Sequence, residues 1–202
     1  MDGAPGLRER KRRRTEADLV AAAVRLIGAD GFPATTVEAI AAGAEVSPRT
    51  FFRLFASKED VVLADERVLF DGFVDRTVPG AGPLLGTLRD ALCAAVEERD
   101  PAWFDRFTAS AAIIDSEPAV ATAALRLCAG TTDRLRARVR AVAGPEVLPE
   151  HLLGLTLDAA VSAWRLARAE WLATPTRAPA GLPALVRRNC DAVAALPGVR
   201  AG

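Results

Sequence analysis

Apolar side chains recur every three or four residues along most of the chain and seldom alternate with polar ones. In the segment 15–29 these positions hold Leu19, Ala22, Ala23, Leu26 and Ile27. This spacing places the side chains on one face of an α-helix, whereas a half-buried strand requires strict alternation. The pattern therefore predicts an all-α protein whose first amphipathic helix covers 15–29 and ends at a glycine.

Capping residues divide the next part of the chain into short helices. The run Thr35-Thr36-Val37-Glu38 has the form of a capping box, in which the Thr35 hydroxyl accepts from an amide three residues on, so a helix is predicted over 36–44. Ser47 followed by Pro48 predicts a third helix, because serine is a good N-cap and the fixed φ of proline suits the first helical position. This third helix is expected to end near Phe55.

A longer helix is predicted over 57–77, beginning at the N-cap Ser57. The following segment, 78–83, contains two prolines and two glycines and is predicted to be a linker. Beyond it the same helical spacing continues to the end of the chain. Further helices are predicted over 84–99, 101–115, 118–143, 149–173 and 182–196. The chain is thus expected to form about nine helices.

The composition of the 202-residue chain removes several classes of protein. Its 26 basic and 26 acidic side chains cancel, and half of its residues are hydrophobic, as in an ordinary globular chain. The one histidine, His151, and the cysteines, Cys93, Cys128 and Cys190, are too far apart for a zinc motif. With no P-loop and no second histidine, an all-helical enzyme is poorly supported. No metal and no cofactor are expected.

The location of the protein is predicted from the same composition. An odd number of cysteines and the lack of an apolar leader favour a reducing cytoplasm without disulfides. The longest weakly charged stretch is shorter than the ~18 residues that span a bilayer, so no membrane helix is expected.

Positive charge gathers at the N-terminus although the net charge is zero. Between Arg8 and Arg14 there are six basic residues and one acid, Glu9. We expect residues 1–14 to form a flexible basic arm, which either is a solvated tail or contacts the phosphates of a nucleic acid.

The helices over 36–44 and 48–55, joined by a three-residue turn, have the form of a helix-turn-helix. Its second helix would turn the phenyl rings of Phe51 and Phe55 toward the core and leave Arg49 and Arg53 outside. A short helix with two outward arginines can enter the major groove and bind guanine O6 and N7. Any capped amphipathic pair would share much of this pattern, so DNA binding is one of two interpretations at this point.

Residues 15–65 resemble the DNA-binding region of TetR-family transcriptional regulators. The resemblance rests on six short motifs: Gly31-Phe32 after the first helix, then TTV, IA, the VS turn, TFFRLF and SKED. It implies an N-terminal three-helix helix-turn-helix domain plus a C-terminal helical domain for ligand binding and dimerisation. The corresponding boundaries are 15–60 and 61–202, after the basic arm.

The resemblance also implies which residues contact double-stranded operator DNA. Phosphate contacts are implied for Thr36, Ser47, Thr50 and Lys58, and contacts to base edges for Pro48, Arg49 and Arg53. Phe52 departs from the family, because many relatives have a tyrosine there whose hydroxyl bonds a phosphate. Its ring could pack on sugar or belong to the core, and Lys58 could be only a solvated charge.

For the second domain, the resemblance implies a homodimer formed by the helices over 149–173 and 182–196. Trp164, Arg168 and Trp171 lie at near-helical spacing and would suit that interface, where tryptophan and arginine are enriched. The alternative is that the apolar stripes of these helices face only their own core.

A pocket for a small hydrophobic effector is the remaining expectation. The residues expected to line it are mostly aromatic: Phe70, Phe73, Trp103, Phe107, Ser110 and Ile114. The expected function is that of a repressor which such an effector releases from its operator. The alternatives are a regulator controlled by a protein partner and, for the aromatic residues, a role as simple core.

Overall fold

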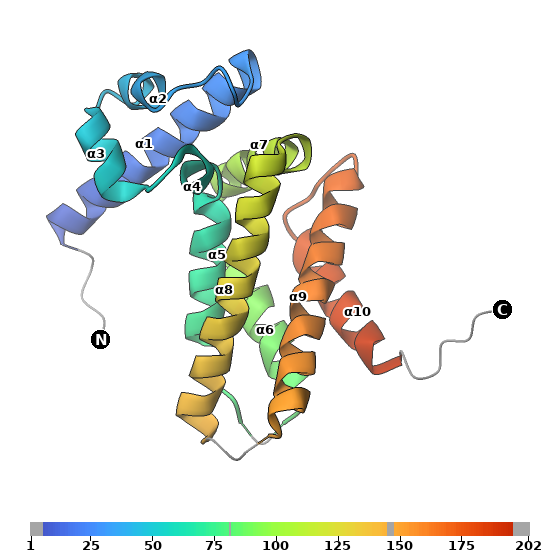
Figure 1. Ribbon diagram of the computed structural model, residues 1–202. Coiled ribbons are helices and arrows are strands. Elements are labelled where there is room, and N and C mark those ends of the chain that lie inside the picture. Colours follow the sequence, from blue (N-terminus) through green and yellow to red (C-terminus); the bar gives the residue numbers. More distant parts are fainter. Residues whose placement is uncertain (1–5, 81, 145–147, 196–202) are drawn as a thin grey trace. The chain divides into compact units, whose positions relative to one another are not determined.

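The computed structural model describes residues 6–80, 82–144 and 148–195, and in this part of the chain it contains ten α-helices and no strand (Figure 1). The first four are α1 (Leu7–Asp30), α2 (Val37–Gly43), α3 (Pro48–Leu54) and α4 (Lys58–Val62). The other six are α5 (Ala64–Arg76), α6 (Leu84–Glu97), α7 (Pro101–Ser116), α8 (Pro118–Ala143), α9 (Glu150–Ala173) and α10 (Gly181–Ala195). The all-α prediction is confirmed.

Helix α1 is longer than expected and includes the basic segment that was expected to be a flexible arm. Arginine, lysine and glutamate are good helix formers, so the segment can extend the amphipathic helix toward the N-terminus. Arg12 pairs with Glu16 four residues on, with 2.9 Å between Nε and Oε1, which supports the added turns. The expectation of a flexible arm is therefore wrong for residues 7–14, and residues 1–5 lie outside the described part.

The long helix expected over 57–77 is divided in two. Leu63 ends α4 with φ −87° and ψ 3°, and α5 begins at the next residue. All four side chains from Val61 to Ala64 are buried. The division therefore falls inside a buried segment of the chain. This division accounts for ten helices where nine were expected.

The described residues form two compact units, each made of segments that are far apart in sequence. Unit 1 contains residues 6–66 together with Asp105–Leu125, and unit 2 contains the described residues of 67–104 and of 126–195. Unit 1 thus contains the helix-turn-helix together with parts of α7 and α8. Sequence spacing gives no sign of this association, because it joins segments that are about forty residues apart.

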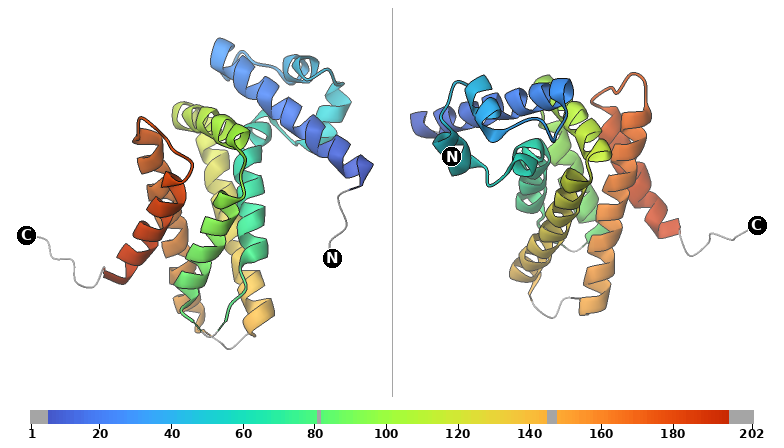
Figure 2. Two further views of the ribbon diagram at one scale, coloured as in Figure 1. Left: turned by 180° about the vertical axis from the view of Figure 1, so that it is seen from behind. Right: turned by 45° about the horizontal axis from the view of Figure 1, so that its top comes forward.

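In unit 2, α10 packs against both α9 and α6, and Figure 2 shows α9 and α10 side by side near the C-terminus. Their shared core contains Leu88 and Leu92 from α6, Leu157 from α9, and Leu182 and Val186 from α10, all buried. This three-helix layer gives unit 2 a hydrophobic core of its own.

Two tryptophans expected at a dimer interface belong instead to the core of unit 2. Trp164 and Trp171 are each 2% exposed. The Trp164 ring meets Phe70 edge to face at 6.1 Å, and the Trp171 indole donates to the Ala178 carbonyl at 3.0 Å. Their spacing places them on the inner face of α9, which the sequence could not distinguish from the outer one.

Candidate nucleic-acid interface

Side-chain caps fix the start of both helices of the helix-turn-helix. Thr36 caps α2 by accepting from the Ala39 amide at 3.1 Å. The Thr35 hydroxyl, expected to serve as this cap, instead donates to the Gly31 carbonyl at 2.9 Å, so the cap lies one residue later than predicted. Ser47 caps α3 as predicted, accepting from the Thr50 amide at 3.2 Å.

The turn between α2 and α3 is closed by backbone hydrogen bonds. The Ala44 amide donates to the Ile40 carbonyl at 3.1 Å, and the Val46 amide donates to the Ala41 carbonyl at 2.9 Å. Between them Glu45 has φ 55°, in the left-handed region that non-glycine residues seldom adopt. The turn is therefore a defined structure that fixes the direction of α3.

The inner face of α3 is held by aromatic and apolar contacts. Phe51 is fully buried and packs on Phe55, with 5.7 Å between ring centroids. Gly43, at the end of α2, lies so close to α1 that an added Cβ would be 3.3 Å from the Ala22 Cβ. The small residue allows α2 to approach α1, and α2 in turn supports α3.

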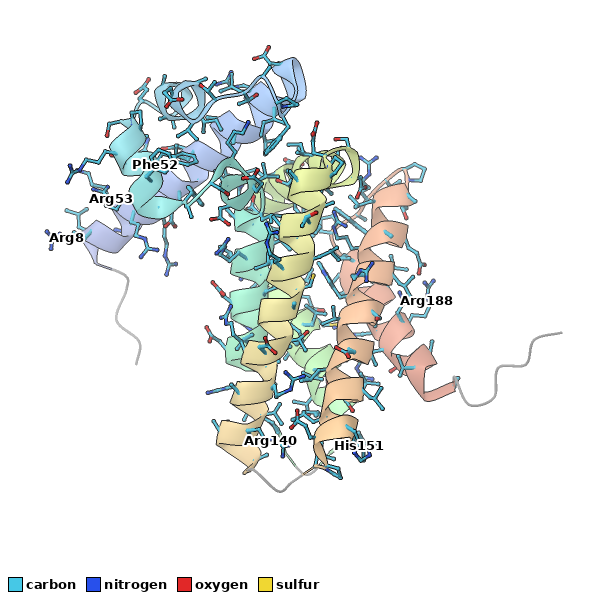
Figure 3. The ribbon with its side chains drawn as sticks, viewed as in Figure 1. Arg8, Phe52, Arg53, Arg140, His151 and Arg188 are labelled. Atoms are coloured by element: carbon cyan, nitrogen blue, oxygen red, sulfur yellow. The ribbon has the colours of Figure 1, made fainter. Side chains whose placement is uncertain are left out.

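The outer face of α3 carries the residues that were predicted to contact DNA. Pro48, Arg49, Phe52 and Arg53 are all exposed, and Thr50 is half-buried. Figure 3 shows Arg53, together with Arg8 of α1, projecting from one side of unit 1. The structure thus groups two arginines and an aromatic ring on one accessible helix face, with Ser47 and its cap at the N-terminal end.

Lys58 has a structural role that sequence reasoning missed. Its ammonium donates to the carbonyls of Phe32 and Thr35, at 2.8 Å in both cases, and lies 4.3 Å from the centroid of the Phe32 ring. Two of its three donors therefore hold the loop between α1 and α2, and one is left for a phosphate. The description of Lys58 as only a solvated charge is wrong.

A buried ion pair connects the two segments of unit 1. The Arg106 guanidinium on α7 donates to both carboxylate oxygens of Asp65, at 2.9 and 2.8 Å, and Asp65 is 6% exposed. Two parallel hydrogen bonds of this kind fix orientation as well as distance. The partners are far apart in sequence and belong to different helices, so no local pattern could have identified the pair.

The residues expected to line an effector pocket are all buried but lie in different units. Phe70, Phe73 and Trp103 belong to unit 2, whereas Phe107, Ser110 and Ile114 belong to unit 1. Ser110 is 3% exposed, and its hydroxyl has no hydrogen-bond partner.

No helix of the described residues combines the length and apolarity that crossing a membrane requires.

The fold and this face together define a class, that of helical proteins with a helix-turn-helix for binding DNA. Residues 19–64 match the family described as "Bacterial regulatory proteins, tetR family". The family consists of DNA-binding regulators and not of enzymes.

Individual relatives agree with this assignment. A stretch of 70 residues is 51% identical to the HTH-type transcriptional regulator TcmR of Streptomyces glaucescens and covers 35% of this chain. It spans only 31% of TcmR. Over most of its length the fold is similar to a TetR-family transcriptional regulator from Mesorhizobium loti, with a TM-score of 0.53, 18% identity, and coverage of 92% of this chain and 98% of the other.

SmeT, described as the repressor of the Stenotrophomonas maltophilia multidrug efflux pump SmeDEF, is similar to the same degree. Its TM-score is 0.53 at 15% identity, with coverage of 89% of this chain and 91% of SmeT. These structures extend the similarity of fold to the helices beyond the helix-turn-helix.

Proposed function

We propose that the protein is a transcriptional regulator in which α3 enters the major groove of operator DNA. The observation that carries the proposal is the exposed face of α3, where Arg49 and Arg53 project from a helix that Ser47 caps and Phe51 fixes to the core. An arginine fork can bond O6 and N7 of guanine, which is the commonest specific contact in the major groove. The capped N-terminus of α3, with Ser47 and Thr50, suits a phosphate of the backbone.

The N-terminal turns of α1 add charge to the same unit. Arg8 and Lys11 are both exposed, and they lie three residues apart on a helix. A helical segment holds its charges in place, so we expect it to contact phosphates and to add attraction that does not depend on sequence.

The experiment that tests DNA reading uses the full chain and a binding site selected from random double-stranded DNA. Arg49→Ala is expected to weaken binding to the selected site by ~1–3 kcal/mol. It should also lower the preference of the protein for this site over random DNA. Arg126→Ala, which removes an exposed arginine of α8 in unit 2, is the matched control and should leave both affinities unchanged. If Arg49→Ala retained the wild-type ratio of specific to random binding, the role given to α3 would be wrong.

We further propose that the protein acts as a homodimer through the exposed face of α9. Leu155 is 65% exposed and Leu166 is 59% exposed. Contiguous exposed apolar side chains on one helix face mark a site of interaction with another molecule. Both leucines belong to a stripe of apolar and small residues at alternating spacings of three and four: Leu152, Leu155, Ala159, Ser162, Leu166, Ala169 and Ala173. Such a stripe fits the seam between paired helices.

The finer part of the proposal is that the regulator is a repressor released by a small hydrophobic effector. The supporting observation is the Ser110 hydroxyl, which is buried on α7 without a hydrogen-bond partner. A buried polar group left unsatisfied costs ~1–3 kcal/mol, which a bound molecule with one polar atom would recover. Phe107 and Ile114 on the same helix would favour the apolar part of such a molecule.

Native mass spectrometry of protein purified from its own host tests the effector proposal. We expect a non-covalent adduct on the wild-type chain that is lost in Ser110→Trp. Ser116→Trp, at an exposed position near the end of the same helix, is the control and should retain the adduct. A wild-type chain without any adduct would favour the alternative, in which a protein partner controls DNA binding.

A further inference from the structure

Two adjacent phenylalanines of α3 have opposite environments. Phe51 is fully buried, whereas Phe52 is 57% exposed and forms an edge-to-face pair with the Phe51 ring, with 5.4 Å between centroids. Successive helical residues are rotated by about 100°, so the two side chains point in different directions, and here only that of Phe51 points into the core. The core therefore explains Phe51 and leaves the ring of Phe52 outside.

The position of Phe52 on the helix places it among the residues proposed to read DNA. It follows Pro48 by four residues and Arg49 by three, so its ring lies between these two on the surface of the helix. Arg53, the next residue, is exposed on the other side of Arg49. The accessible face of α3 is thus partly cationic and partly apolar.

A phenyl ring can make only a limited set of contacts in the major groove. It neither donates nor accepts a conventional hydrogen bond, so it cannot read the polar edge of a base or satisfy a phosphate. The base edges there carry one apolar group, the C5-methyl of thymine, and phenylalanine is among the side chains that contact it. Packing on deoxyribose is the other apolar contact, but it would not depend on the base.

We propose that Phe52 reads a thymine through its C5-methyl group, next to the base pair that Arg49 reads. This inference rests on the proposed placement of α3 in the major groove. It assigns a specificity-determining role to a side chain with no polar atom, and it makes a methyl group part of the binding site.

The experiment removes the methyl group without altering the base pair. A binding site is first selected from random duplex DNA with the full chain, and each thymine is then replaced in turn by deoxyuridine. At one thymine in each half-site we expect binding to weaken about fourfold, the equivalent of one methyl-sized group returned to water. Replacement at the other thymines supplies the control within the same duplex.

Variants of the protein identify the side chain responsible. Phe52→Ala should bind the thymine and deoxyuridine duplexes equally, whereas Phe52→Tyr, which keeps the ring, should still prefer thymine. Val68→Ala removes another exposed apolar side chain, outside α3, and should keep the wild-type preference. Because Phe52 lies outside the core, its variants should keep the wild-type circular dichroism spectrum.

Three results would overturn the inference in different ways. Equal wild-type binding to every deoxyuridine duplex would show that the ring does not read the methyl group. A preference for thymine that persists in Phe52→Ala would assign the reading to another residue. Failure to select any duplex would overturn the proposed function, and this inference with it.

Discussion

Among single residues, the Asp65 carboxylate is held in a largely buried position by the Arg106 guanidinium. Arg106→Ala would leave a buried charge without its main partner, and we expect it to lower the free energy of unfolding by about 2–3 kcal/mol. The measurement is urea denaturation followed by circular dichroism.

Arg134→Ala is the matched control for this variant. Arg134 pairs with Asp71 at 2.6 Å, but both side chains are nearly half exposed. An exposed pair of this kind contributes less than ~1 kcal/mol, so the control should unfold close to the wild-type midpoint. If the free energy of unfolding fell equally in the two variants, burial of the Asp65–Arg106 pair would add nothing to its contribution to stability.

Two buried cysteines of unit 2 make the stability of the folded protein depend on pH in the alkaline range. Burial raises the pKa of both Cys93 and Cys190 from 9.0 to about 11, because desolvation disfavours the thiolate. A thiol whose pKa is raised by folding stabilises the native state fully below about pH 9, and this contribution is lost as the pH rises toward 11.

We therefore expect the free energy of unfolding to fall between pH 9 and 11 by up to ~1.4 kcal/mol per pH unit for each thiol. Replacing both cysteines by alanine should flatten this part of the profile and leave the slope between pH 6 and 8 unchanged. An unchanged slope above pH 9 in the double variant would assign the alkaline loss to other groups.

Single residues also show where sequence reasoning stops. Exposure of Arg49 and Arg53 could be predicted, because the position of Phe51 in a short amphipathic helix fixes which face is outside, whereas the sequence left open whether Phe52 belongs to the core. The contacts of Lys58 with the loop before α2 could not be predicted, since they depend on a tertiary approach across more than twenty residues. The inward position of Trp164 depends in the same way on the packing of unit 2.

At the scale of helices, the basic residues at the start of α1 are expected to contribute to DNA binding through their charge. Because Arg8 and Lys11 are exposed, we expect Arg8→Gln and Lys11→Gln together to weaken binding to all DNA sequences alike. The slope of log Kd against log salt should fall by about one for each phosphate that the protein no longer neutralises. Glutamine is a good helix former, so α1 should keep its length.

The control for these two substitutions is Arg126→Gln in unit 2, which should leave the salt dependence at the wild-type value. If the α1 variant also kept the wild-type slope, these basic residues would be solvated charges on the helix that make no contact with DNA.

Element boundaries were predictable wherever a cap or a breaker marks them. Ser47, Pro48 and Ser57 begin α3 and α4 as expected, since their effect is local. The division at Leu63 was missed because no glycine, proline or capping side chain marks it, and the helical state of residues 7–14 was missed although Gly6 is the N-cap of α1. Packing decides the first of these, and intrinsic helix propensity decides the second.

At the scale of the whole molecule, the proposed homodimer depends on the exposed leucines of α9. Leu166→Glu should dissociate the dimer and weaken operator binding at the same time, because one half-site alone makes too few phosphate contacts at physiological salt. Leu125→Glu changes an equally exposed leucine, at 58%, on α8 and should do neither. Light scattering at micromolar concentration measures the first effect, and a dimeric Leu166→Glu would remove this face from the interface.

The central claim, that α3 reads operator DNA from the major groove, is tested most directly by dimethyl sulfate protection of the selected site. This reagent methylates guanine N7 in the major groove and adenine N3 in the minor groove, so one measurement reports both faces of the duplex. We expect the wild-type chain to protect guanine N7 at positions repeated one helical turn apart, ~34–36 Å, and the double variant Arg49→Ala, Arg53→Ala to lose that protection. Protection of adenine N3 alone, or guanine protection that persists in the double variant, would contradict the account.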